Sequence, residues 1–245
     1  MNSRRRVNST VMPQSINPKA IEYAKLVAER KACFDCAKLT NPSKYPDLDS
    51  NEIGPYSRWQ GNLDAEILIV GQDSSDIETY LNFGGDWPGE SVQTNLALVQ
   101  LVRAAGINIA PPRRGYADDR LFFTNAVLCL KPANPEKKRS MRGKISPDYF
   151  RNCGARFLRP TIELVCPRAV ATLGEPALKA TLSAFGLRAS GGFLALVDSG
   201  RTFDLSCGAR LFPMCHPNPT VLNTHRLWHQ QEADWKHLGR WLRAA

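Results

Sequence analysis

The segment ILIVGQDSSD, residues 67–76, begins as a buried strand and ends in two carboxylates. Four apolar residues, Ile67 to Val70, are followed by a glycine and then only by polar residues. A short apolar run of this kind is typical of a strand that is covered on both faces. Such a strand has no packing reason to place Asp73 at its end. The simplest explanation is that Asp73 and Asp76 cap the next helix, because Asp is a preferred N-cap residue.

Three more apolar runs of strand length follow, at 121–127 (LFFTNAV), 168–174 (RAVATLG) and 211–215 (LFPMC). Segments with helical patterns lie between or after them, at residues 94–106, 146–165, 175–185 and 225–242. Alternating strands and helices form a parallel sheet that is covered on both faces. We therefore expect an α/β fold, a three-layer α/β/α sandwich whose central, mostly parallel sheet has four strands.

Two of the helical segments carry details that a structure can test. Pro160 should kink or divide the segment 146–165, because proline disrupts a helix interior. The last segment has an apolar stripe that is more typical of a core contact than of a stacking platform. Its members are Trp228, Trp235, Leu238 and Leu242, with Trp241 at the margin.

The chain is strongly basic, with 32 Lys and Arg against 23 Asp and Glu and a formal net charge of +9. This balance suits a polyanionic partner, because neutralised phosphates release counterions. Part of the excess lies in residues 131–144, KPANPEKKRSMRGK, which hold a single acid. A solvated basic loop without function explains that segment equally well. Its cations are Lys131, Lys137, Lys138, Arg139, Arg142 and Lys144.

The chain carries no recognisable export or membrane signal. Residues 1–16 contain arginines and serines but no apolar h-region, and no apolar run approaches the roughly 20 residues of a membrane helix. We expect residues 1–16 to be a flexible basic tail and residues 17–245 to form one domain. Seven cysteines, an odd number, argue against a disulfide framework and leave free thiols or a metal centre.

Polar segments follow three of the predicted strands: GQDSSD at 71–76, CLKPAN at 129–134 and CHPNP at 215–219. Ligands of open α/β sheets bind beyond the carboxyl ends of the strands. An Asp and a His at that edge combine a carboxylate that can hold water with an imidazole that can stabilise an oxyanion. Asn125, inside an apolar run, is costly to bury without partners, and its amide could read the edge of a base.

These motifs, in this order and spacing, resemble the uracil-DNA glycosylase superfamily over roughly residues 30 to 240. The segments that carry the resemblance are VGQDSSD, FFTNAVLCLKPAN, VATLGEPAL and MCHPNP. GQD resembles the water-activating motif Gly-Gln-Asp-Pro-Tyr-His of the classical branch, and HPN resembles its His-Pro-Ser motif. TNAVLC, followed by a Pro-rich basic loop and another cysteine, is closer to the iron–sulfur branches, families four and five.

The resemblance implies a monofunctional enzyme that flips uracil out of DNA and hydrolyses its N-glycosidic bond. Asp73 is then expected to hold the attacking water, and His216 to stabilise the negative charge on the departing base. The expected substrate-binding residues are Gly71, Gln72, Asn125 and Asn218, with Trp87 or, as the competing candidate, Phe83 stacking on the base. The expected DNA contacts are Lys137, Lys138, Arg139 and Arg142.

The same resemblance predicts a four-cysteine centre. Cys33 and Cys36 form a Cys-x-x-Cys pair, and the other two ligands fall on Cys129 and Cys153. From spacing alone, zinc and a four-iron cluster are equally suited to four thiolates. The resemblance favours a 4Fe-4S cluster, which would anchor both ends of the basic loop. The remaining cysteines are then expected to be buried thiols: Cys166, Cys207 and Cys215.

The first motif departs from both branches. The iron–sulfur branches usually read Gly-Glu-x-Pro-Gly, and relative to the classical motif Ser74, Ser75 and Asp76 replace Pro, Tyr and His. That tyrosine blocks the pocket against the thymine methyl group, so its loss makes other deaminated bases possible substrates. One alternative is a non-catalytic binder of damaged or abasic DNA. A second is a zinc-stabilised hydrolase of free nucleosides, which the basic loop disfavours. The expected partner is DNA and not a membrane, for a monomeric protein of a bacterial-type cytoplasm that acts at the nucleoid.

Overall fold

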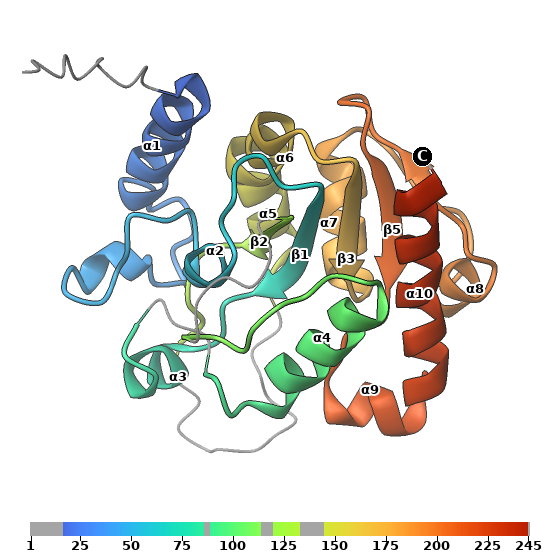
Figure 1. Ribbon diagram of the computed structural model, residues 1–245. Coiled ribbons are helices and arrows are strands. Elements are labelled where there is room, and N and C mark those ends of the chain that lie inside the picture. The colour runs from blue at the N-terminus through green and yellow to red at the C-terminus, as the bar shows by residue number, and fades with distance from the viewer. Residues whose placement is uncertain (1–16, 86–88, 114–119, 133–144, 245) are drawn as a thin grey trace, which may run out of the picture.

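The computed structural model describes residues 17–85, 89–113, 120–132 and 145–244 (Figure 1). The tail expected at residues 1–16 and most of the basic segment 131–144 lie outside the described residues. The elements, in which η1 is a 3-10 helix and η2 a π-helix, are α1 (Pro18–Lys31), η1 (Pro42–Lys44), α2 (Pro55–Trp59), β1 (Ile67–Asp73), α3 (Ile77–Asn82), α4 (Gln93–Ala104), β2 (Leu121–Val127), α5 (Pro147–Cys153), η2 (Gly154–Leu158), α6 (Arg159–Val165), β3 (Ala169–Leu173), α7 (Glu175–Ala184), α8 (Phe193–Asp198), β4 (Phe203–Asp204), β5 (Arg210–Met214), α9 (Pro219–Thr224) and α10 (Trp228–Ala244).

The described strands form one sheet in the order β2-β1-β3-β5-β4. The four strands expected from the sequence are β1, β2, β3 and β5, and neighbours among them pair in parallel. The sheet differs from the prediction by a fifth strand, β4, which pairs antiparallel with β5 at the edge. Because β4 has only two residues, it is too short to leave a strand pattern in the sequence.

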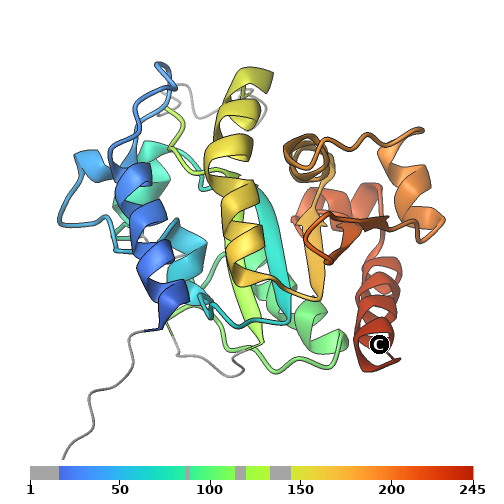
Figure 2. The same ribbon diagram turned by 90° about the horizontal axis from the view of Figure 1, so that it is seen from above.

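Side chains along β1 alternate between two apolar layers, as the pleat of a strand requires. Leu68 and Val70 join the layer formed with α1, α6 and α7, whereas Ile67 and Ile69 join the layer formed with α4 and α10. Figures 1 and 2 show these two sets of helices on opposite sides of the sheet. The expected three-layer α/β/α sandwich is therefore confirmed.

The apolar stripe of α10 packs in the core as predicted. Trp235, Leu238 and Leu242 are buried, and Trp228 and Trp241 pack against the same layer while remaining partly exposed. The segment 146–165 is divided, but the break is the π-helix η2, and Pro160 follows it in the first turn of α6. Single π-turns within helices are rare overall, and those that occur often lie at functional sites.

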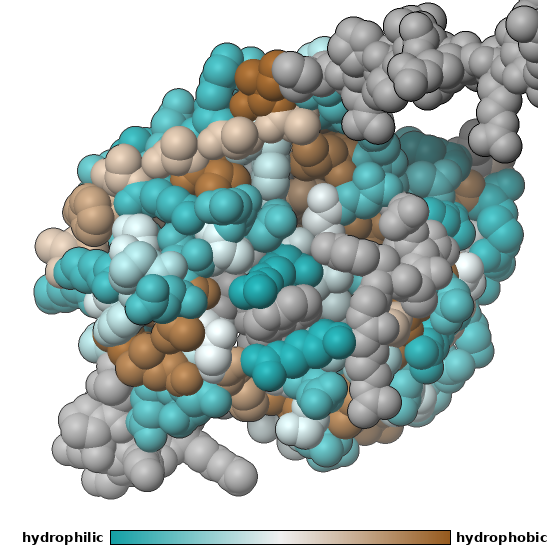
Figure 3. All heavy atoms as spheres, turned by 60° about the vertical axis from the view of Figure 1, so that its left-hand side comes forward, coloured by the Kyte–Doolittle hydropathy of each residue, from teal (hydrophilic) through white to brown (hydrophobic). Residues whose placement is uncertain are grey.

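Hydrophilic side chains dominate the face of the molecule shown in Figure 3, and they separate the apolar patches there from one another. Among the described helices, none is long and apolar enough to cross a membrane.

Candidate functional site

A cavity of about 1060 Å³ lies at the carboxyl ends of the parallel strands. The structure brings together around it most of the site residues expected from the sequence: Gly71, Gln72, Asp73, Phe83, Asn125, His216 and Asn218. Trp87 and the loop cations Lys137, Lys138, Arg139 and Arg142 lie outside the described residues. A smaller hollow of about 430 Å³ beside α7 and α8 contains none of these groups.

Asp73 ends β1 and holds a nearly buried carboxylate, with 7% of the side chain exposed. Its Oδ1 accepts the backbone N–H of Ser75 at 3.0 Å and faces the Lys131 ammonium at 2.9 Å. Its Oδ2 accepts a hydrogen bond from the Gln72 amide at 2.6 Å. An ionised carboxylate has about four lone-pair sites, so these described partners leave one on Oδ2.

The two carboxylates of the first motif have different roles in the structure. Asp76 is the N-cap of α3, and its Oδ1 accepts the backbone N–H of Thr79 at 2.8 Å. Asp73 does not cap this helix. Between them, Ser75 has a φ of 101°, a left-handed conformation that is uncommon for residues other than glycine. Helix capping therefore explains Asp76 and leaves Asp73 for another function.

Asn125 lies opposite Gly71 in the register of β2 and β1 and is 97% buried. A Cβ atom at position 71 would lie only 2.3 Å from Asn125 Oδ1, so only glycine leaves room for this amide. Asn125 Nδ2 donates to Ser74 Oγ at 3.1 Å. The serine that replaces the proline of the classical motif thus holds the buried amide in one orientation.

His216 follows β5 and is oriented by Asn218. Asn218 is the N-cap of α9, and its Oδ1 accepts the backbone N–H of Val221 at 2.8 Å. This turns its amide nitrogen toward His216 Nδ1, at 3.2 Å. Because an amide nitrogen can only donate, Nδ1 is the acceptor and the proton of the neutral ring is on Nε2. The contact therefore orients the imidazole and favours the tautomer whose N–H is on Nε2.

Tyr56, on α2, lines the same cavity and was not identified from the sequence. Its hydroxyl donates to Asn95 Oδ1 at 3.2 Å, and Asn95 Nδ2 donates to the carbonyl of Gly89 at 2.8 Å. Burial, and then the negative charge of Asp73, raise the pKa of Tyr56 to about 12. The phenol therefore stays protonated near neutral pH. No sequence motif marked this residue, because it lies on the short helix α2, ahead of the first strand and away from the polar segments that follow the strands.

Lys131 corrects the interpretation of the basic segment, in which it was counted as a loop cation. Only 8% of the residue is exposed, and its ammonium points at Asp73. Its backbone N–H donates to the carbonyl of Ser75, and its carbonyl accepts the N–H of Ile77, both at 3.0 Å. Lys131 is therefore part of the cavity wall and is attached to the loop that follows Asp73.

The four cysteines expected as ligands are all buried free thiols: Cys33, Cys36, Cys129 and Cys153. They are close enough to perturb one another. A hydrogen bond from Cys153 lowers the pKa of Cys36 to about 7 and raises that of Cys153. Burial, and then the charges of Cys36 and Cys33, raise the pKa of Cys129 to about 12. In the part of the chain that is described, no three His, Cys, Asp or Glu residues form a group that could hold a metal ion.

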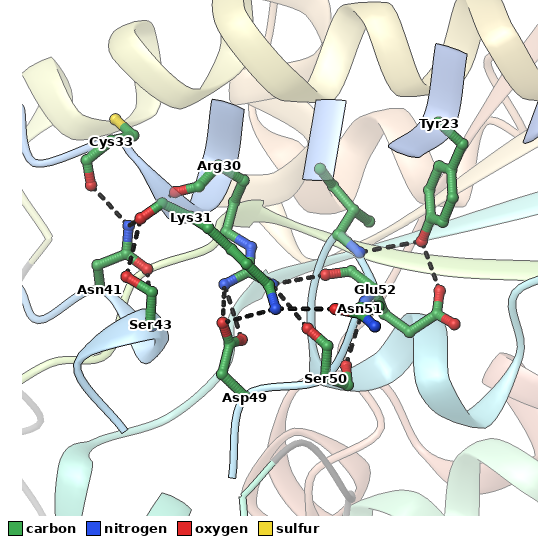
Figure 4. Close-up of polar contacts among 11 residues, drawn as sticks. Tyr23, Arg30, Lys31, Cys33, Asn41, Ser43, Asp49, Ser50, Asn51 and Glu52 are labelled. Atoms are coloured by element: carbon green, nitrogen blue, oxygen red, sulfur yellow. Dashed lines mark hydrogen bonds and ion pairs between the residues drawn. The ribbon is translucent and has the colours of Figure 1, made fainter. Parts of the chain in front are cut away.

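A buried polar network supports the loop that carries Cys33 (Figure 4). Arg30, at the end of α1, pairs with Asp49 at 2.7 Å, and the two side chains are 2% and 1% exposed. Asn41 donates to the backbone carbonyls of Arg30 at 2.7 Å and of Cys33 at 2.6 Å. From the other side, the guanidinium of Arg156, in η2, donates to Cys33 Sγ at 3.4 Å.

The remaining cysteines differ from expectation in two of three cases. Cys215 is buried as predicted, but Cys166 is exposed and Cys207 is half-buried. Cys166 has a left-handed backbone conformation at the end of α6, where the chain turns outward before β3. Its position in a helix cap, outside the apolar layers, accounts for its exposure.

The fold and the cavity define an α/β protein with a ligand site at the carboxyl edge of its sheet. A family model, the uracil DNA glycosylase superfamily, matches residues 59–239. A type-5 uracil-DNA glycosylase of Pyrobaculum aerophilum is 26% identical over 181 residues, which are 71% of this chain and 70% of the relative. The chain belongs to the uracil-DNA glycosylase superfamily, as its motifs predicted.

Proposed function

We propose that the protein is a monofunctional DNA glycosylase that excises uracil by hydrolysing its N-glycosidic bond and leaves an abasic site. One observation carries this proposal: Asp73, Asn125 and His216 line a single cavity. Its volume of about 1060 Å³ is sufficient for a nucleotide that has left the base stack. Residues 17–245 act as the one catalytic domain.

Asp73 holds the attacking water and stabilises the sugar, which gains oxocarbenium character as the bond breaks. The described contacts leave one lone-pair site on Oδ2, and a water can donate a proton to it. The carboxylate is fixed by its partners before the substrate arrives. Groups that are oriented in advance stabilise a developing charge without paying for reorganisation.

His216 stabilises the negative charge that grows on the base carbonyl as uracil departs. The Asn218 contact supports this role, because an acceptor at Nδ1 directs the ring proton to Nε2. The amide of Asn125 reads the base edge, with Gly71 and Gln72 beside it. Either Phe83, which lines the cavity, or Trp87 stacks on the base, and stacking of this kind contributes roughly 1 to 3 kcal/mol.

We further propose that Cys33, Cys36, Cys129 and Cys153 hold a 4Fe-4S cluster, with zinc as the alternative. The chemistry of the donors supports this proposal, because all four are buried free thiols and the charges of Cys36 and Cys33 act on Cys129. In the described residues the four thiols do not yet form a closed metal-binding group. The group would supply a structural cross-link between the start of the chain and both ends of the basic loop. Lys137, Lys138, Arg139 and Arg142 of that loop contact the DNA phosphates. Broad visible absorbance and four irons per chain would support the cluster, whereas one zinc per chain would exclude it.

A Cys129→Ser variant tests the anchoring role of the centre. We expect it to lose the cluster and to bind DNA more weakly. Loss of the cluster with unchanged DNA affinity and excision would contradict the anchoring role and leave the glycosylase proposal standing.

The decisive experiment uses labelled oligonucleotides with one uracil, hypoxanthine or xanthine, in single and double strands. We expect a strand break at uracil after alkali treatment and none before it, as a monofunctional enzyme requires. Breakage at hypoxanthine or xanthine would extend the base range, in line with the loss of the pocket tyrosine at Ser75. A break before alkali would contradict the monofunctional mechanism.

A second candidate, a non-catalytic binder of damaged or abasic DNA, is favoured by the pairing of Asp73 with Lys131, which offsets the charge of the carboxylate. This candidate predicts tight binding to abasic DNA and no breakage with any base of the panel. The same assay therefore separates the two functions.

A further inference from the structure

Lys131 is a buried cation inside the proposed active site, and none of the proposed catalytic steps uses it. Its ammonium is 2.9 Å from Asp73 Oδ1, and the side chains of Lys131 and Asp73 are 10% and 7% exposed. Burying an ion pair removes both charges from water at a large desolvation cost, which distinguishes this pair from an exposed surface pair. Lys131 lines the cavity and is therefore placed to act on the site.

We propose that Lys131 is a positioning residue for Asp73: it fixes the carboxylate so that the lone pair of Oδ2 that the described contacts leave open faces the attacking water. This inference rests on the proposed function. The Ser75 N–H and Lys131 hold Oδ1, while Gln72 holds Oδ2 from the side. Three contacts on three sides prevent the carboxylate from rotating about its Cβ–Cγ bond. Without Lys131, Oδ1 gains a free acceptor site, and water can bind in an unproductive place.

The backbone of Lys131 makes this placement stiff. Its N–H and carbonyl bond to Ser75 and Ile77, on either side of Asp76, so the lysine and the loop after Asp73 move together. The preceding residue, Leu130, exchanges two backbone hydrogen bonds with Thr40, at 2.9 and 2.8 Å. Cys129 comes directly before Leu130. The three-residue segment 129–131 therefore connects a proposed cluster ligand, Cys129, to Lys131, whose ammonium holds the Asp73 carboxylate.

The alternative task for Lys131, contact with a DNA phosphate, is disfavoured by its burial and by its partner. A phosphate would have to compete with a carboxylate that is already 2.9 Å away. If Lys131 positions Asp73, its loss should slow the chemical step. If it contacts a DNA phosphate, its loss should weaken DNA binding. The two tasks are therefore separable by measurement.

The test is single-turnover excision at saturating uracil DNA, with DNA affinity measured in parallel. Lys131→Met keeps the length of the side chain and removes its charge. We expect a loss of about 10- to 100-fold in rate, because small misplacements of a catalytic group cost up to about 10²-fold. Affinity for the DNA should change less than about twofold. Lys131→Arg should recover most of the rate, because it restores a cation to Oδ1.

A double-variant cycle with Asp73→Asn distinguishes positioning of Asp73 from a general structural role, because a structural role would give additive losses of rate. If Lys131 acts only through Asp73, Lys131→Met should cost nothing further in the Asp73→Asn background. Lys236→Met is the matched control, because Lys236 pairs with Glu232 at 2.8 Å on the half-exposed side of α10. Metal content and visible absorbance should be equal in all variants, so that a loss of rate is not a loss of the proposed metal centre.

Each outcome bears on the inference. Full rate in Lys131→Met, an additive loss in the double variant, or a loss of affinity alone would overturn it. A covalent adduct of Lys131 with the DNA after borohydride reduction would also overturn it, since the lysine would then be a nucleophile. If the wild-type protein excises no base at all, the proposed function fails and this inference fails with it. Wild-type excision that Lys131→Met leaves intact would overturn the inference alone.

Discussion

Two buried carboxylates, Asp49 and Asp73, meet similar partners in two regions of the molecule. The Asp49 side chain is 1% exposed and 2.7 Å from the Arg30 guanidinium. The Asp73 side chain is 7% exposed and 2.9 Å from the Lys131 ammonium. Asp49 lies in the loop that follows η1 and faces Arg30 at the end of α1, within the network of Figure 4. Asp73 lies at the end of β1 and lines the large cavity.

The two carboxylates differ in whether a substrate can reach them. This difference separates a carboxylate that only stabilises the fold from one that can also take part in a reaction. Both oxygens of Asp49 face the same guanidinium nitrogen, at 2.7 and 2.9 Å, with Lys31 at 3.6 Å from Oδ2. Asp73 lines the large cavity, and its partners among the described residues leave one lone-pair site on Oδ2. A closed ion pair can only support the fold around it, whereas an open one can also hold a water molecule. At position 49 a carboxylate therefore stabilises the loop that carries Cys33, whereas at position 73 it takes part in the proposed reaction.

The largest effect is expected from breaking the closed pair. Asp49→Ala leaves the Arg30 charge buried and without its partner, which costs about 3 to 5 kcal/mol in free energy of unfolding. Urea unfolding measures this loss. Asp64→Ala is the control, because Asp64 is 68% exposed in its pair with Lys19, and exposed pairs contribute less than about 1 kcal/mol. Equal losses in the two variants would show that burial does not distinguish these pairs.

A smaller effect is expected at Asn218, which orients the imidazole of His216 in the cavity. Asn218→Asp keeps an oxygen that can cap α9 but cannot donate to His216 Nδ1. We expect a fall of about tenfold in single-turnover rate, the equivalent of one hydrogen bond of about 1.4 kcal/mol. Asn218→Ser should stay near the wild-type rate, because a hydroxyl caps the helix and can also donate. The orientation account is wrong if the Asp and Ser variants react at the same rate.

The smallest effect is expected at Ser74. Ser74→Ala removes the acceptor that holds the Asn125 amide, so the donor and acceptor of that amide are less strictly placed. We expect the ratio of kcat/KM for uracil over hypoxanthine to fall by about threefold. Ser183→Ala, on the exposed side of α7, serves as the control. An unchanged ratio would remove Ser74 from the determinants of base choice.

The sequence predicted the sheet and most of the cavity wall for a definite physical reason. Apolar runs of strand length mark the buried strands, and parallel strands bring their carboxyl ends to one edge, so the polar segments after them must meet there. Asp73, Asn125 and His216 follow from that rule. Their family resemblance and the family model then agree.

The sequence could not predict the contacts that depend on the path of the loops. Lys131 stands in a basic segment, and nothing local shows that its ammonium turns inward to Asp73, which lies 58 positions earlier. Tyr56 and Asn95 likewise form a hydrogen bond in the cavity wall without any motif to connect them. Cys166 was expected to be buried because cysteines usually are, whereas its place in a helix cap decided the outcome.

The most direct test of the central claim, that Asp73 performs chemistry, is single-turnover excision of uracil by Asp73→Asn beside the wild-type protein. Asn keeps the shape and an acceptor for the Ser75 N–H but removes the charge. We predict a rate about 10²- to 10³-fold lower, as for the loss of one preorganised electrostatic group. Binding to uracil DNA should be retained. Full activity in Asp73→Asn would contradict the account, because the other carboxylate of the motif, Asp76, already caps a helix.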